Sequence, residues 1–284
     1  MWVRWWILLI PPLVVGFTLV AASQFIFLRV SFYQDLGLGR IGDEVVIENY
    51  VRFLTDGFYL KILWVTVKTS ALAALSTLIL GFPVAYLIAR MRSSWSMFLL
   101  AGIVVSTFVT IVIKVYGLIV IFSADGLFNQ TMLNLGLFNK PYSVFGNETG
   151  VVIGLMHFTL GFGVLLLYSI IQTIPSSLES AAQIHGASRW RVYYRVIIPL
   201  SLPGVTAMLL MVFNMCMGAF TSAALLGGGR VFTLPVMIQR IVMMDIKYSM
   251  GATIAAVLLF SVIVINILSI YLLRRLRAAH LVMV

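Results

Sequence analysis

The sequence has few charged residues and almost no cysteine. Only 10% of its 284 residues are charged, whereas a soluble domain is about one quarter charged. Because 62% of the residues are apolar, the chain cannot cover a globule with polar side chains, which excludes a water-soluble enzyme. The single cysteine, Cys216, excludes an internal disulfide and a thiolate zinc site.

Motifs that catalyse reactions or bind nucleotides are also missing. The Gly-Gly-Gly-Arg run at 227–230 lacks the Lys-Ser/Thr pair of a phosphate-binding loop, so we expect no ATP hydrolysis by that route. The histidines His157, His185 and His280 are far apart in the sequence and have no carboxylate at metal-ligand spacing. We therefore expect a chain that is not an enzyme and that itself binds no metal or cofactor.

Long apolar runs make up most of the chain. A helix that crosses a membrane needs about 20 residues, and these uninterrupted runs lack the alternation of β-barrel strands. The runs therefore predict an all-α membrane protein with six transmembrane helices. Their approximate ranges are 5–32, 62–89, 96–122, 150–171, 202–226 and 250–273.

The basic residues predict how the chain lies in the membrane. The formal net charge is +10, but the basic residues stand singly between apolar runs, which favours topology signals and contacts to anionic lipid over nucleic-acid binding. With the amino terminus in the cytoplasm, the inner connections are dense in arginine and every acid except Glu179 lies outside. The inner arginines are Arg4, Arg90, Arg92, Arg189, Arg191, Arg195, Arg274, Arg275 and Arg277. We therefore expect both termini in the cytoplasm.

One inner connection, residues 172–201, is longer and more regular than the others. A proline and two serines precede a short predicted helix at 178–184, and Gly186 stands where a left-handed helix cap is favoured. A second helix is predicted to begin at Ala187 and to stop before Pro199. Two interpretations stay open on physical grounds: an amphipathic hairpin on the inner leaflet, or a docking element for a cytoplasmic partner.

The spacing of small residues in this segment resembles the signature loop of bacterial ABC importer permeases. That pattern is Glu-Ala-Ala, three residues, Gly, nine residues, and then Ile-x-Leu-Pro. Here Ser180, Ala181 and Ala182 are followed at the same spacing by Gly186 and Pro199. The match departs from the pattern at Ser180, where the family has Glu.

Two further details separate this loop from the family pattern. An acid, Glu179, stands one place before the family position, and Ile198 replaces Leu. Any salt bridge that the family makes from its Glu is therefore in doubt here. The resemblance implies that the loop is a coupling element that sits in a groove of an ATPase subunit. The residues implied in this coupling are Glu179, Ser180, Ala181, Ala182, Gly186, Ala187 and Pro199.

The resemblance extends over nearly the whole chain and is strongest to the polyamine-type branch of these permeases. Segments 49–60, 81–86, 114–116 and 224–228 are all similar to that branch. It implies a type I ABC importer permease fold, with residues 1–284 as one transmembrane domain in the bacterial inner membrane. The implied solute is a polyamine or a related small compound. The implied partners are two ATPase subunits that carry ATP and Mg²⁺, a second permease subunit, identical or homologous, and a periplasmic binding protein.

Three polar residues in apolar runs are candidates for the translocation pathway. Lys114 costs the most free energy to place within a membrane, because it lies about eight residues from the end of its predicted helix. Its ammonium either faces a cavity or gate or extends to the headgroups. Tyr116 is its near neighbour. Asn214 either lines the pathway or hydrogen-bonds to another helix, and the second is favoured. Lys68 is expected to extend to the outer headgroups.

Two other classes of membrane protein fit the sequence less well. A secondary carrier would typically have inverted repeats, broken helices and buried carboxylates, yet no Asp or Glu lies deep in any apolar run. A membrane enzyme would need a nucleophile–base pair or metal ligands, and the histidines are not placed for either. The sequence therefore favours a channel-forming permease subunit of an ATP-driven importer.

Overall fold

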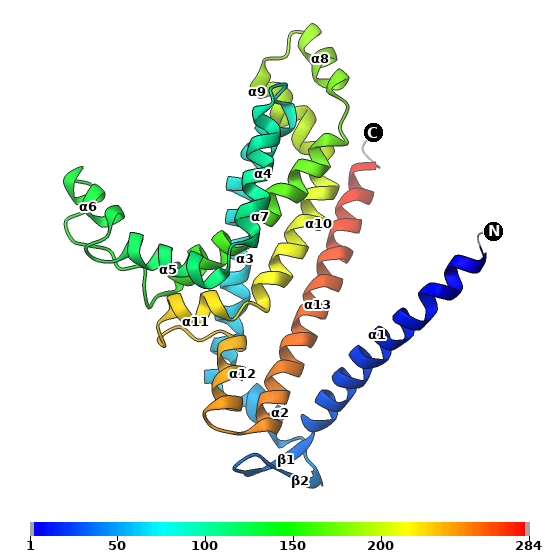
Figure 1. Ribbon diagram of the computed structural model, residues 1–284, viewed down its shortest axis with the longest axis vertical. Helices are drawn as coiled ribbons and strands as arrows, with labels where there is room; N and C mark the ends of the chain where they lie inside the picture. The colour runs from blue at the N-terminus through cyan, green and yellow to red at the C-terminus, as the bar shows by residue number, and fades with distance from the viewer. Residues whose placement is uncertain (1–2, 282–284) are drawn as a thin grey trace. The chain divides into compact units, whose positions relative to one another are not determined.

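A computed structural model describes the backbone of residues 3–281 and the side chains of residues 9–271. Among these described residues, six stretches are long and apolar enough to cross a membrane, which confirms the predicted number. Figure 1 shows the chain as helices and one small hairpin. The elements are α1 (Val3–Val30), β1 (Tyr33–Gly37), β2 (Arg40–Val45), α2 (Glu48–Thr55), α3 (Gly57–Arg90), α4 (Trp95–Phe108), α5 (Ile111–Phe122), α6 (Leu127–Asn134), α7 (Glu148–Gln172), α8 (Ser176–Ile184), α9 (Arg189–Val192), the π-helix η1 (Tyr193–Ile197), α10 (Ile198–Met217), α11 (Thr221–Gly227), α12 (Leu234–Met243) and α13 (Tyr248–Leu281). The arginines at positions 4, 274, 275 and 277 lie outside the described side chains.

Two of the predicted spans are wrong as continuous helices, because the structure interrupts each of them. The run at 96–122 forms two helices, α4 and α5, because Val109 and Thr110 are extended, and the third apolar stretch is instead Ile111–Asn134. β-Branched residues around this break lower its helix propensity. The run at 202–226 is also interrupted, since α10 ends at Met217 and α11 begins at Thr221.

The chain divides into two compact units, and the boundary falls within α3. The first unit combines residues 1–63 with 234–284 and contains α1, the β1–β2 hairpin, α2, α12 and α13. In this unit the carboxylate of Asp35 on β1 accepts hydrogen bonds from the amides of Ser249 (3.3 Å) and Met250 (2.9 Å). These amides belong to the first turn of α13, where helix N–H groups have no partner inside the helix. Asp35 therefore joins the β1–β2 hairpin to the start of α13.

The second unit, residues 64–233, is built around α7. Helices α4, α5, α10 and α11 all pack against α7, and Thr77 on α3 shares a 2.9 Å hydrogen bond with Thr159 on α7. Glycines allow this close packing, as is typical of helices in membranes. A Cβ added at Gly154 would collide with α11, one at Gly161 with α4, and one at Gly163 with α3.

The packing at Gly163 generates a stability prediction. An added Cβ would lie 2.5 Å from the Thr77 methyl group, so Gly163→Ala forces α3 and α7 apart. We expect a loss of about 1–3 kcal/mol, the usual cost of overpacking, measured as a lower apparent Tm in detergent. Gly117→Ala is the matched control, because nothing lies within 4 Å of its added Cβ. Equal Tm values for the two variants would contradict this account of the α7 interface.

Candidate functional site

The 172–201 segment forms a helical hairpin. It contains α8, a turn at Gly186, and α9. The predicted first helix and its left-handed cap are confirmed: Gly186 has a φ of +81°, and the Ala187 amide donates to the Ala182 carbonyl at 3.0 Å. The side chain of Ser188 accepts a hydrogen bond from the Arg191 amide and caps α9.

The second helix does not stop before Pro199, so that prediction is wrong. α9 runs through η1 directly into α10, and the Ile198 amide donates to the Tyr193 carbonyl, five residues back. Pro199 stands in the first turn of α10. A proline in a helix interior lacks one N–H and collides with the preceding turn. The wider π-helical turn before it changes the local hydrogen-bond register, so the chain accommodates the proline and remains helical.

The loop exposes apolar and basic side chains together. Ile184 is 84% exposed and Trp190 is 72% exposed, while Leu178 and Tyr194 are also exposed. Three arginines, at positions 189, 191 and 195, are exposed on the second arm of the hairpin. The only acid of the segment, Glu179, is withdrawn from this surface, with a side chain only 12% exposed. The exposed surface of the loop is therefore apolar and positively charged.

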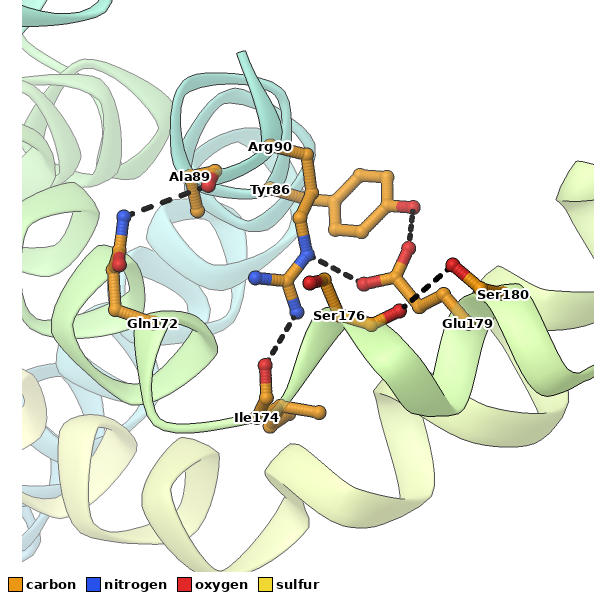
Figure 2. A network of polar contacts seen from close by, with 8 residues as sticks. All are labelled: Tyr86, Ala89, Arg90, Gln172, Ile174, Ser176, Glu179 and Ser180. Carbon is orange, nitrogen blue, oxygen red and sulfur yellow. Dashed lines mark hydrogen bonds and ion pairs between the residues drawn. The ribbon is translucent and has the colours of Figure 1, made fainter. Parts of the chain in front are cut away.

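Glu179 holds α8 to the last turn of α3 (Figure 2). One carboxylate oxygen accepts from Arg90 Nε in a short ion pair, and the other accepts from the Tyr86 hydroxyl at 3.0 Å. Arg90 Nη2 also donates to the Ile174 carbonyl at 2.9 Å. The sequence pattern indicated only a topology role for Arg90 and predicted no partner for Glu179. The partner was missed because a contact across 89 residues leaves no local signal.

Aromatic rings hold the second arm of the hairpin. The ring of Tyr193 on η1 meets the rings of Phe82 and Tyr86 on α3 edge-on, at centroid distances of 5.7 and 5.1 Å. The Tyr193 ring also meets the rings of Trp190 and Tyr194 edge-on. Edge-to-face pairs of this kind are favourable beyond the area that they bury. Both arms of the hairpin are thus attached to α3.

The other residues of the predicted coupling set lie on α8 and around the Gly186 turn, except Pro199, which stands in the first turn of α10. Ser180 is exposed, and its hydroxyl donates only to the Ser176 carbonyl, at 3.4 Å. Ala181 is exposed on α8, whereas Ala182 and Ala187 are half-buried on either side of the Gly186 turn. Glu179 is therefore the one member of the set that the structure joins to another helix by an ion pair.

The predicted pathway residues come from two helices of the second unit. Lys114 lies in the first turn of α5, immediately after the break at 109–110, and is half-buried. The expectation that it lies within one continuous helix over 96–122 is therefore wrong. Tyr116 is 57% exposed, and Asn214 is half-buried on α10. Lys68, which was expected to extend to the headgroups, forms a 2.8 Å ion pair with Glu148.

No metal-binding cluster of three or more His, Cys, Asp or Glu side chains occurs among residues 9–271.

Comparisons with known proteins agree with this architecture. Residues 78–278 match the family model described as "Binding-protein-dependent transport system inner membrane component". A spermidine/putrescine transport system permease protein PotB from Haemophilus influenzae is 29% identical over 236 residues, which cover 83% of this chain and 82% of that protein. The PotB protein of Escherichia coli K12 is 34% identical over 184 residues, 65% of this chain and 66% of that protein.

Solved structures with the same fold include a bacterial ABC transporter involved in the import of the acidic polysaccharide alginate. One of its chains superimposes with a TM-score of 0.77 at 18% identity, and the match covers 96% of both chains. A chain of the MetNI methionine ABC transporter has a TM-score of 0.61 at 15% identity, covering 78% of this chain and 99% of that one.

The family match spans most of the chain, and both the fold and the apolar helices agree with it. The chain therefore belongs to the family of inner-membrane components of binding-protein-dependent transport systems, as a multi-pass, type I ABC importer permease subunit rather than an enzyme.

Proposed function

We propose that this chain forms, with a second permease subunit, the membrane channel of an importer driven by two ATPase subunits that bind ATP and Mg²⁺. The observation that carries the proposal is the hairpin at 172–201. Its apolar side chains Ile184 and Trp190 and its arginines are exposed on an element that an ion pair and aromatic contacts attach to α3. Such a surface suits docking into an apolar groove with an acidic rim, because desolvated aromatic anchors and complementary charges stabilise interfaces.

The coupling role within this hairpin is part of the proposal. Ala181 and Ala182 allow close approach of an ATPase surface, and Gly186 supplies the turn that gives the hairpin its shape. Glu179, Ser180, Ala187 and Pro199 complete the coupling element. The chain as a whole acts as one transmembrane permease domain, residues 1–284, from which the segment 172–201 extends.

The orientation in the bacterial inner membrane is also proposed. The excess of arginine in the connections supports a cytoplasmic location for both termini and the hairpin. The opposite side would then receive the solute from a periplasmic binding protein. No nucleic acid is involved, and the basic residues serve topology, lipid headgroups and the hairpin surface.

The proposed solute is a polyamine or a related small compound. The PotB relatives carry spermidine and putrescine in their names, and this chain is similar to them over most of its length. Except for Asp125, which is exposed between α5 and α6 within the Ile111–Asn134 stretch, the acids of this chain lie outside the six apolar stretches or at their ends. An imported cation would therefore meet outer acids, aromatic rings or the second permease subunit rather than a buried carboxylate of this chain.

The assembly itself provides the first test. The tagged chain, co-expressed with the ATPase, second permease and binding protein from its own gene neighbourhood, should purify with two ATPase subunits per complex. Proteoliposomes of this complex should take up labelled spermidine or putrescine only with ATP and binding protein. A chain that purifies alone and transports solute without an ATPase would overturn the proposed function.

The hairpin provides the second test. Gly186→Val places a β-branched side chain at a φ of +81°, which costs about 1–3 kcal/mol of backbone strain, and Ala182→Asp adds a charge to the docking surface. We expect both variants to insert in the membrane and to lose at least most of their ATP-driven uptake. Gly186→Asn is the control, because Asn tolerates the left-handed conformation. Normal uptake by the Val and Asp variants would show that the hairpin does not couple.

Lys114 provides the third test of a pathway role. Lys114→Met keeps the length of the side chain and removes its charge. If the ammonium faces a water-filled path together with Tyr116 and Asn214, the variant should assemble normally but change the uptake rate or the leak of small cations. Uptake and ion leak equal to those of the parent in vesicles would remove Lys114 from the pathway and leave it as an anchor.

A further inference from the structure

We infer that one stripe of α3, formed by Phe82, Tyr86 and Arg90, is the attachment through which movement of the hairpin reaches the transmembrane helices. The inference rests on the proposed function, in which the hairpin docks an ATPase. These three side chains are positioning residues: they act through Glu179 and Tyr193 of the hairpin and do not themselves form the exposed docking surface.

The sequence spacing puts the three side chains on one face of α3. They follow one another at intervals of four residues, and side chains four residues apart lie above one another on a helix. The stripe occupies the last turns of α3, which ends at Arg90. It is therefore a continuous surface at the end of a long apolar helix.

Arg90 fixes the first arm of the hairpin at two points. Its Nε donates to Glu179 on α8, and its Nη2 donates to the Ile174 carbonyl, just before α8 begins. The two donors of a planar guanidinium cannot be reoriented independently. The geometry thus fixes the start of α8 both through a side chain and through the backbone (Figure 2).

The ion pair is sheltered enough to hold its geometry. The side chains of Arg90 and Glu179 are 20% and 12% exposed, and Tyr86 occupies the second carboxylate oxygen of Glu179. Solvent screens such a pair less than a surface pair. Removal of either partner leaves a partly buried charge without its counterion, which is costly.

Tyr86 joins the two arms of the hairpin. Its hydroxyl donates to Glu179 on the first arm, and its ring packs edge-on against Tyr193 on the second arm. Phe82 supports the same Tyr193 ring one turn earlier. A displacement of either arm therefore acts on α3 through Tyr86.

The attachment and the docking surface use different side chains. Ile184 and Trp190 are largely exposed, whereas Glu179 is turned toward α3. Changes at Arg90 should consequently leave ATPase docking intact and alter the transmission of movement. This separates the stripe from residues whose loss prevents assembly.

The experiment compares two ion pairs that both start from α3. Arg90→Gln and Glu179→Gln break the attachment, and Arg90→Lys keeps the charge but not the planar fork. Lys68→Gln and Glu148→Gln are the matched controls, because this pair joins α3 to α7 and is 44% and 41% exposed. Each variant is reconstituted as the complete complex, and the measured quantity is solute imported per ATP hydrolysed.

We expect Arg90→Gln and Glu179→Gln complexes to retain their ATPase subunits and to import about fivefold less solute per ATP, in line with couplings within one hydrogen-bonded network. Arg90→Lys should recover part of this loss. The control variants should stay within about twofold of the parent, since exposed ion pairs contribute little. Unchanged solute per ATP in the Arg90 and Glu179 variants, or an equal loss in the controls, would overturn the inference.

A second measurement does not depend on transport. A spin label at Ile184→Cys, with Cys216→Ala to remove the native thiol, reports the mobility of α8 in the reconstituted permease. Arg90→Gln should increase this mobility, and so should the milder Tyr86→Phe, which serves if the Arg90 variants fail to assemble. Unchanged mobility in both would refute the attachment. If instead the parent chain binds no ATPase while the mobility changes as expected, the proposed function fails and the attachment stands.

Discussion

Close approach of neighbouring helices to α7 is the constraint on which the 64–233 unit depends. In a membrane, apolar side chains gain little by leaving lipid for protein, so helices associate through tight packing and hydrogen bonds. The glycines of α7 provide the packing on three sides, toward α3, α4 and α11. The Thr77–Thr159 hydrogen bond adds a polar contact at the α3 interface. The packing of α3 against α7 in turn positions the stripe of Phe82, Tyr86 and Arg90, which contacts the hairpin at 172–201.

The hairpin is a small element with two unlike surfaces. The surface toward α3 contains an ion pair, a tyrosine hydroxyl and edge-to-face rings, which specify one geometry. The other surface exposes apolar side chains and arginines without an acid. A specific attachment on one side and an open apolar surface on the other are what an element needs if it is to move as a rigid body with a partner.

Local signals in the sequence predicted the local features well. The helix around 178–184 and the left-handed turn at Gly186 follow from a proline, a serine pair and a glycine within one short segment. The number of apolar stretches follows from composition. The break at Val109 and Thr110 was missed because hydropathy does not distinguish a continuous helix from two consecutive ones, although a run of β-branched residues marked the place.

Long-range contacts could not be predicted in this way. Arg90 and Glu179 are 89 positions apart, and Asp35 contacts the start of α13 from more than 200 positions away. Each of these side chains has an ordinary local context, so nothing nearby in the sequence distinguishes a topology signal from half of an ion pair. Only the helix packing brings the partners together.

The π-helical turn at 193–197 makes the angular relation between the hairpin and α10 depend on the number of residues between them. One residue corresponds to about 100° of rotation around an α-helix. A deletion that converts η1 into regular α-helix would therefore turn Trp190 and its neighbouring arginines about a quarter of a circle relative to α10. The number of residues in η1 thus sets the rotation of the hairpin relative to α10. Insertions or deletions here would turn the exposed surface of the hairpin away from its present direction without changing its residues.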